Sequence, residues 1–584
     1  MAVRRGVLIV FILIGLAMMA SCGGLLVLGL VVGGSTPMSV PDNATLYLPL
    51  NAPFGELAPV SVFNLVNRRP TVAMTIDAIR KAKRDTRVKT LVITPSAAGA
   101  LWGQVQEVRA ALEDFRQSGK PVTAYLEFGG AQEYYLASAA DRVVLMPAGQ
   151  LDLTGIATYE LFFRGAFDKL GVTPDLLHIG EYKTAANTFT ERNFTKAHLE
   201  MTKSLNRDWY DELVRAIAAS RKKSVEEIRK VIDSGPFQPE AALAAGLIDQ
   251  VAYEDELDDK APIQGTRRLE ASSYQQAYVA GASSTAGAKI AVLYAVGTIA
   301  SGKSTLDGSG GVVGSETFVD WLRKVRVDSA VRAIVIRIDS PGGSAIASEV
   351  IWRELMLTRD MKPLIVSMGD VAASGGYYIA VPAHAIVAQP GTLTGSIGVV
   401  TGKFALGGAL DKIGVGTGVV SDGKYADIYS PFRPFSAEER ARIEEQLRST
   451  YELFLSRVAE GRKTTKEKID TIAQGRVWTG RQALERGLVD ELGGLDRAIR
   501  LAKERAKLDV NKDVELLVYP QEPSIFDIFE NSFGGMTSAS ARMSAAAKVG
   551  GAEEQARTIE SLASVLGRFR RGEALMLMPN VFVR

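Results

Sequence analysis

The sequence predicts an α/β protein in which two tandem copies of one domain follow an N-terminal transmembrane helix. Three observations lead to this fold class. The chain opens with a long uncharged apolar run, its motifs recur at a nearly constant spacing, and short buried strands alternate with helices inside each copy. Such alternation is typical of a mainly parallel sheet covered by helices.

The apolar run covers residues 7–34, and its 28 residues are enough for a helix to cross about 30 Å of hydrocarbon. Arg4 and Arg5 precede it, which predicts a cytoplasmic N-terminus and sends the rest of the chain to the other side of the membrane. Because a cleaved signal peptide has a shorter apolar region, we predict an uncleaved anchor. The alternative is a lipoprotein, since "MASC" at 19–22 resembles a cleavage box ending at Cys22.

The repeat is visible in three pairs of similar segments: GAFDKLGV from 165 and GALDKIGV from 408, DTRVKTLVI from 85 and DSAVRAIVI from 328, GLIDQV from 246 and GLVDEL from 487. The first two pairs are 243 positions apart and the third is 241 apart, which indicates a duplicated domain rather than a short solenoid repeat. We therefore predict a first domain at 40–279, a small-residue linker at 280–288 and a second domain at 289–530. Residues 531–584 lie outside the repeat and receive no role.

The second copy shows the alternation most clearly. Its predicted elements are strands at 333–339, 362–370 and 384–391 and helices at 344–360, near 374 and at 437–460. In open α/β sheets, reactive groups gather where strands end and helices begin. Two glycine-bearing turns, "DSPGGS" at 339–344 and "AASGGYY" at 372–378, lie at such points.

The composition excludes several classes of function. A net charge of +2 gives the chain no overall positive potential that would attract nucleic acid. The single cysteine excludes an intrachain disulfide and a cysteine-based zinc site. Of the three histidines, His178, His198 and His384, none lies among reactive-looking neighbours.

Ser374, in the second turn, is a candidate nucleophile surrounded by small residues that would admit a substrate carbonyl. The backbone N–H groups of Gly343 and Gly375 would form an oxyanion hole beside it. The structural alternatives are close helix packing at the serine and a tight turn at the glycines. A lysine can replace histidine as the base if burial lowers its pKa.

The duplication points to that lysine. Ser374 aligns with Ala131 in the first copy, and Lys183 of the first copy aligns with Ala426 in the second. Each copy has therefore kept one half of a dyad, which a site between the copies would explain. Drift of two inert domains is the alternative explanation.

The segments "DSPGGS", "AASGGYYIAVPAHAIVAQPGTLTGSIGVV" and "GEYKTAANTFT" resemble signal peptide peptidase A in its long, duplicated, membrane-anchored form. The resemblance implies two crotonase-like domains, related to the Clp protease subunit. It also implies a serine–lysine dyad of Ser374 and Lys183, with Ser396 orienting the lysine and Gly343 and Gly375 in the oxyanion hole. Neither a metal nor another cofactor is implied.

The same resemblance implies a serine endopeptidase that hydrolyses cleaved signal peptides or other apolar peptides. The protein would be a single-pass membrane protein of the bacterial cytoplasmic membrane, with its catalytic domains on the outer (periplasmic) face. It would assemble as a homotetramer and bind no nucleic acid. Two other functions stay open at this stage. A crotonase-type acyl-CoA enzyme would bind CoA, and a non-catalytic membrane scaffold would keep its role after loss of both dyad residues.

Overall fold

The structure is a computed structural model that describes residues 40–51, 54–57, 70–96, 100–259, 261–274, 284–305, 311–521, 573–579 and 582–583. The predicted transmembrane span at 7–34 and Cys22 lie outside these residues. Within the described ranges, no helix has the length and apolar character needed to cross a membrane.

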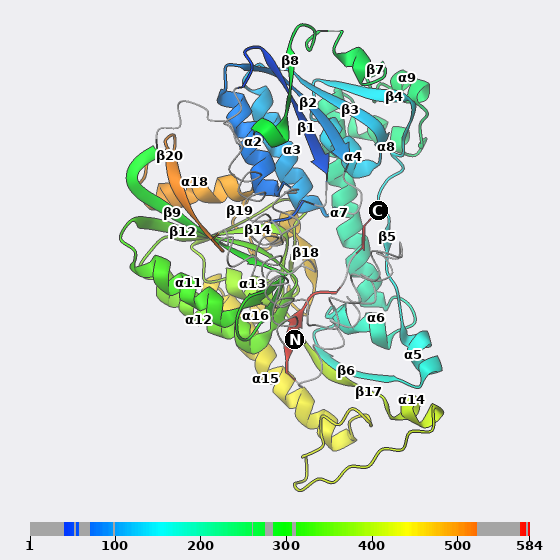
Figure 1. Cartoon of the computed structure of the whole chain (residues 1–584). Helices are drawn as coiled ribbons and strands as arrows, with labels where there is room; N and C mark the ends of the chain where they lie inside the picture. The colour runs from blue at the N-terminus through cyan, green and yellow to red at the C-terminus, as the bar shows by residue number, and fades with distance from the viewer. Residues whose placement is uncertain are drawn as a thin grey trace, which may run out of the picture.

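The first repeat is built on a six-stranded parallel sheet in the order β7-β4-β3-β2-β1-β8 (Figure 1). Its strands are β1 (Ala44–Asn51), β2 (Val88–Ser96), β3 (Val122–Gly129), β4 (Arg142–Leu151), β7 (Gln250–Val251) and β8 (Arg267–Glu270). Its α-helices are α2 (Val72–Arg84), α3 (Trp102–Arg116), α4 (Ala131–Ala137), α5 (Arg164–Leu170), α6 (Asn187–Thr190), α7 (Lys196–Arg221), α8 (Val225–Ile232), α9 (Pro239–Ala244) and α10 (Ala271–Tyr274). Two short 3-10 turns, η2 (Thr184–Ala186) and η3 (Asp255–Leu257), and a short strand β5 (Thr158–Tyr159) complete it.

The second repeat is built on a larger sheet whose main path runs β18-β16-β14-β12-β9-β20, with β15 beside β14 and β19 beside β15. The strands are β9 (Ser284–Val296), β12 (Val331–Ser340), β14 (Leu364–Ala373), β15 (Ala385–Ala388), β16 (Leu393–Gly395), β18 (Val477–Thr479), β19 (Glu491–Leu492) and β20 (Asp513–Tyr519). The helices are α11 (Ser315–Val327), α12 (Ala345–Arg359), α13 (Gly375–Ala380), α14 (Gly407–Lys412), α15 (Ala437–Gly461), α16 (Lys466–Asp470), α17 (Gly480–Glu485) and α18 (Leu495–Arg505). All pairs of this sheet are parallel except β16 with β18.

A third sheet joins both repeats and the C-terminal tail, in the order β11-β10-β13-β21-β17-β6. It contains β6 (Thr173–Ile179) from the first repeat and β10 (Thr298–Ala300), β11 (Val312–Gly314), β13 (Gly342–Ser344) and β17 (Val399–Ala405) from the second. Its remaining strand is β21 (Leu575–Leu577), from the tail that received no role in the sequence analysis. A last strand, β22 (Phe582–Val583), pairs with β5.

Local sequence accounts for the elements near the junction. Strand β12 is buried at almost every position, as its run of apolar β-branched residues predicts for a central parallel strand. Helix α15 begins after Ser436, whose side chain accepts a hydrogen bond from the Glu439 N–H in a capping box, and it continues through a stretch without glycine or proline. Strand β9 begins at Ser284, inside the predicted linker, where Ser284 pairs with Asp513 of β20, and its pairing with β12 begins at Lys289.

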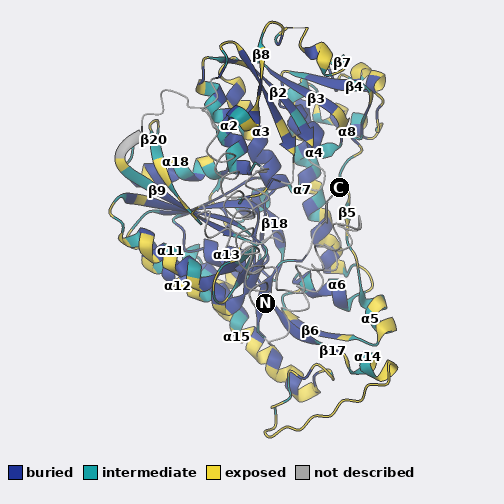
Figure 2. Cartoon of the chain, viewed as in Figure 1, coloured by how far each residue is buried: buried dark blue, intermediate teal, exposed yellow. Residues whose placement is uncertain are grey.

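Each repeat has its own apolar core, and the surfaces where the repeats meet are buried as well (Figure 2). The first core includes Val371, Leu393 and Val477 of the second repeat. Trp209, on α7 of the first repeat, donates a hydrogen bond to the Gly391 carbonyl over 3.1 Å. The two repeats therefore pack as one body around the junction where the candidate dyad residues lie.

Candidate active site

Lys183 and Ser374, which the duplication pairs across the repeats, lie side by side in the structure. Lys183 Nζ is 2.7 Å from Ser374 Oγ, although the two residues are 191 positions apart. Both side chains are fully buried, with exposed fractions of 0%. The structure thus brings one half of the predicted dyad from each repeat into direct contact.

Ser374 occupies the sharp corner between strand β14 and helix α13. Its φ of 56° lies in the left-handed region, which costs a non-glycine residue free energy and persists only where the surroundings impose it. The Ser374 N–H donates to the Gly395 carbonyl over 2.8 Å, and its carbonyl accepts from the Tyr378 N–H over 2.8 Å. These bonds hold the backbone of Ser374 at the corner.

Lys183 lies on the loop between β6 and η2, and a close contact with the second repeat holds this loop in place. The Tyr182 N–H donates to the Gln474 carbonyl over 2.8 Å. A Cβ added at Gly475 would lie 2.5 Å from the Cα of Lys183, so only glycine fits there. The sequence analysis missed Gly475, because its requirement comes from a loop of the other repeat.

Burial controls the protonation of this lysine. The pKa of Lys183 is lowered well below its ordinary value of 10.5, because removal from water penalises the charged ammonium. A neutral amine has two N–H donors and one lone pair. The carbonyl and hydroxyl oxygens of Ser396 lie 2.8 and 3.0 Å from Nζ and can take the two donors. The lone pair then faces the Ser374 hydroxyl, which is the arrangement that a general base needs.

Ser396, predicted as the residue that orients the lysine, is fully buried between β16 and β17 and also has a left-handed φ of 51°. Its N–H donates to the Arg476 carbonyl over 2.7 Å, which fixes the loop. The conformation lets both its carbonyl and its hydroxyl face Lys183.

The two predicted oxyanion glycines lie against each other. A Cβ added at Gly375 would come within 3.1 Å of the Gly343 nitrogen, so the backbone of the two turns is in contact. A Cβ added at Gly343 would lie 2.0 Å from the Ile299 carbonyl oxygen on β10. The glycine pair is therefore sterically required, and it leaves backbone N–H groups beside the serine.

A second buried polar cluster joins the repeats away from the dyad. Arg337 on β12 donates to Glu56 over 2.6 and 3.0 Å and to Glu107 over 2.7 Å, and both carboxylates belong to the first repeat. Next to them, burial and the negative charge of Glu56 raise the pKa of Asp339 to about 7. The same two causes, together with the charge of Asp339, raise the pKa of Asp370 well above its ordinary range.

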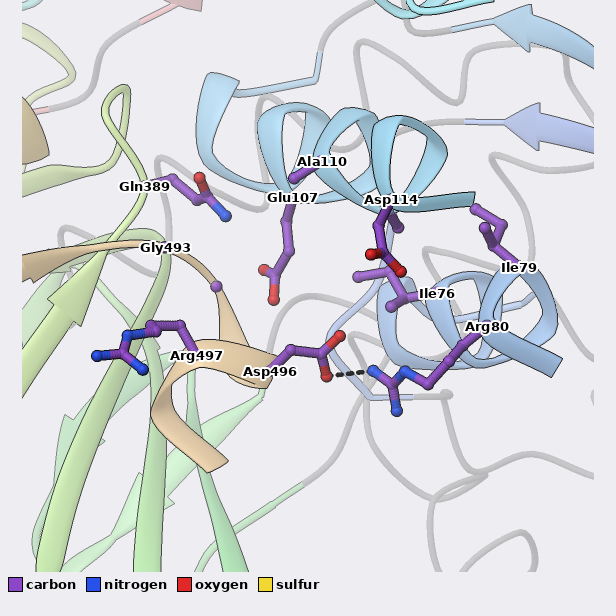
Figure 3. Close-up of a pocket in the computed structure, with 12 residues that line it drawn as sticks. Ile76, Ile79, Arg80, Glu107, Ala110, Asp114, Gln389, Gly493, Asp496 and Arg497 are labelled. Atoms are coloured by element: carbon purple, nitrogen blue, oxygen red, sulfur yellow. Dashed lines mark hydrogen bonds and ion pairs between the residues drawn. The ribbon is translucent and has the colours of Figure 1, made fainter. Parts of the chain in front are cut away.

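A cavity of about 290 Å³ opens between α2, α3 and α18 beside this cluster (Figure 3). Glu107 faces it, and an ion pair between Arg80 and Asp496 closes one side. Its lining includes neither dyad residue. In the described parts of the chain, no group of three histidine, cysteine or acidic residues is arranged to hold a metal ion.

Comparisons with known proteins identify the family. The model of Peptidase family S49 matches residues 114–264 and 357–509, one match in each repeat and together just over half of the chain. The chain belongs to peptidase family S49. Its repeated match confirms the duplication that the sequence predicted.

Similar S49 proteins include the chloroplastic serine protease SPPA of Arabidopsis thaliana, 36% identical over 75% of this chain and 66% of the relative. Protease 4 of Salmonella typhi is 37% identical over 79% of this chain and 75% of the relative. This S49 chain is therefore a serine protease of the signal peptide peptidase A type with two repeats. Among solved structures, a stomatin-specific protease (1510-N, S97A mutant) matches 41% of this chain and 99% of its own at 16% identity, but its TM-score of 0.26 is too low to carry an argument.

Proposed function

We propose that this S49 protease hydrolyses cleaved signal peptides or other apolar peptides with a Ser374–Lys183 dyad formed between the repeats. The observation that carries the proposal is the 2.7 Å contact between the Lys183 amine and the Ser374 hydroxyl in a fully buried site. Desolvation favours the neutral amine, which is the form that can accept a proton.

In the proposed mechanism, Ser374 Oγ attacks the peptide carbonyl carbon while Lys183 takes the hydroxyl proton. The backbone N–H groups of Gly343 and Gly375 hold the oxyanion, and the loss of one such donor typically costs about 10²–10³ in rate. The lysine then gives its proton to the leaving amine, which breaks the C–N bond and leaves an acyl-serine. Water adds to the ester by the same route and restores the free serine.

We further propose that each repeat has a crotonase/ClpP-like fold and that the chain acts as a single-pass homotetramer on the periplasmic face of the bacterial cytoplasmic membrane. The uncharged run at 7–34 supports the anchor, since its length suits a membrane-spanning helix. An anchor of this kind would keep the site close to apolar peptides left in the bilayer. The resemblance to signal peptide peptidase A supports the substrate class and the assembly.

The test compares four full-length chains, purified in detergent, on an apolar signal-peptide substrate. Ser374→Ala and Lys183→Met are expected to lose hydrolysis, because one removes the nucleophile and the other the base. Lys403→Met is the matched control, since Lys403 on β17 is also a buried lysine with a lowered pKa, but its amine donates to the Ile428 carbonyl. Wild-type rates in both dyad variants would refute the proposed mechanism.

A further inference from the structure

The C-terminal segment 573–579, drawn in red in Figure 1, contributes strand β21 to the third sheet, which joins the two repeats. Its strand β21 is inserted between β13 and β17 and runs antiparallel to both. Gly342 pairs with Leu577, Gly343 with Met576 and Ser344 with Leu575. The tail therefore forms a ladder with the same turn that carries the proposed oxyanion glycines.

Backbone and side-chain bonds hold this segment at both ends. The Ala345 N–H donates to the Ala574 carbonyl over 3.2 Å, and the Met578 N–H donates to the Pro341 carbonyl over 2.9 Å. Thr401 Oγ1 donates to the Glu573 carbonyl over 2.9 Å, and the Ser344 hydroxyl donates to the Glu573 carboxylate.

The side chains of the segment fill apolar sites on both faces of the strand. Ala574, Leu575, Met576 and Leu577 are all less than 9% exposed. Met576 packs into the core of the second repeat, whereas Leu575 and Leu577 pack with Phe189 and Val400 in a separate cluster. An extended peptide with alternate side chains in pockets is the usual form of recognition by strand addition.

The backbone of Met576 reaches the catalytic turn itself. A Cβ added at Gly342 would lie 1.9 Å from the Met576 carbonyl oxygen and 2.7 Å from the Gly375 nitrogen. A peptide carbonyl therefore lies beside one of the N–H groups proposed to bind the oxyanion. In the same arrangement Ser374 and Lys183 are completely buried, so an external peptide reaches them only if a covering segment leaves.

We infer that residues 573–579 occupy the substrate groove of their own chain and act as a built-in competitor of the peptide substrate. The inference rests on the proposed function for the identity of the groove, but the docking itself rests on the strand pairing alone. Attachment to the same chain gives such a segment an effective concentration on the order of millimolar. Even a weakly bound apolar peptide would then hold the groove closed at low substrate concentration.

Docking is tested first, in a chain that carries Ser374→Ala and Cys22→Ser. The first substitution makes the result independent of hydrolysis, and the second removes the native cysteine. Val400 and Leu575 are directly paired, and Cβ atoms of such antiparallel pairs are about 4.5–5.5 Å apart, close enough for a disulfide after small adjustment. We expect Val400→Cys with Leu575→Cys to form an intrachain disulfide, seen by peptide mapping without reduction. Val399→Cys with Leu575→Cys is the control and should stay reduced, because neighbouring strand residues point to opposite faces.

Competition is tested in the active full-length chain. A chain ending at Gly572 should show an apparent KM for an apolar peptide that is lower by about tenfold or more with kcat unchanged, which corresponds to a groove free in about one molecule in ten. Met576→Asp should act in the same direction, since a charge at a 1% exposed position expels the segment. Leu516→Asp on β20 is the matched control at a 40% exposed position and should leave KM unchanged.

The outcomes separate the two proposals. Absence of the Val400–Leu575 disulfide, or a disulfide that joins two chains, would overturn docking within one chain. An unchanged KM in the chain ending at Gly572 would overturn competition. A disulfide that forms while no variant hydrolyses the peptide would refute the proposed function and competition, and it would leave the docked segment in place.

Discussion

Gly475 offers the most direct test of whether the position of Lys183 matters for catalysis. It belongs to the second repeat, and a Cβ added there would lie 2.5 Å from the Cα of Lys183 in the first. Carbon atoms in contact are normally about 3.5–4.0 Å apart, so Gly475→Ala must displace the lysine loop by about 1 Å. A displacement of about 1 Å in a catalytic arrangement can cost about 10²-fold in rate. We expect kcat to fall by about that factor.

Gly487→Ala is the matched control for this substitution. Gly475 and Gly487 have φ values of 77° and 71°, so alanine costs about 1–2 kcal/mol of backbone strain at either position. No atom lies within 4 Å of a Cβ added at Gly487, so that variant has the strain without the displacement. Peptide hydrolysis and urea unfolding should be measured for both.

Two results would refute this reasoning. One is a Gly475→Ala enzyme with the kcat of Gly487→Ala, which would mean that the lysine tolerates displacement or does not act. The other is an equal loss of kcat in both variants, which would assign the effect to strain in the second repeat. A loss confined to Gly475→Ala, with the protein still folded at the assay temperature, is the expected outcome.

Three further predictions concern protonation and the junction between the repeats. As the proposed base, Lys183 must be neutral, so kcat/KM should rise with pH to a plateau, and the midpoint of the rise should lie well below pH 10.5. A midpoint near pH 10.5 would contradict a desolvated base. Asp339 has a pKa of about 7 in the folded chain against 3.8 ordinarily, so its protonation stabilises the fold at low pH and this contribution is lost as pH rises through 7. Asp339→Asn should therefore narrow the difference in melting temperature between pH 5 and pH 8. An unchanged difference would refute a raised pKa at Asp339 as its cause. Arg337→Met should lower the free energy of unfolding by about 3–5 kcal/mol in urea, because Glu56 and Glu107 lose their buried partner, and adding Glu107→Gln should recover part of that loss.

The repeat and its two divergent positions made the central pair of the site predictable. The 243-residue offset places Ser374 opposite an alanine and Lys183 opposite another alanine, and this pattern favours a site between the copies over drift of two inert domains. The strand and helix on either side of Ser374 were predictable as well, since a buried apolar strand that ends at small residues is a local signal. The structure has both elements, but β14 extends to Ala373, three residues beyond the predicted end at Asp370, and α13 begins at Gly375.

Contacts between segments that are far apart in the chain could not be predicted from the sequence. Strand β21 has three residues and no periodicity that could identify it, and its partner Gly343 lies 233 positions away from Met576. Gly475 is one of 56 glycines, and its special role appears only when the Lys183 loop is placed against it. Short strands and close backbone approaches of this kind are consequences of tertiary structure, so local patterns do not predict them.

The junction also explains why a duplicated chain should hold one such site and not two. The reverse pairing would use Ala131 of the first repeat and Ala426 of the second, and both groups needed for chemistry are gone from it. Ala426 is exposed, whereas Lys183 is buried, so the second repeat does not dock its equivalent loop as the first repeat does. A lysine kept at position 426 would have remained in water, without the desolvation that lowers the pKa of Lys183. The Lys183 loop is docked by the pairing of β6 with β17 and by the Tyr182–Gln474 hydrogen bond, and this docking brings its amine to the Ser374 hydroxyl.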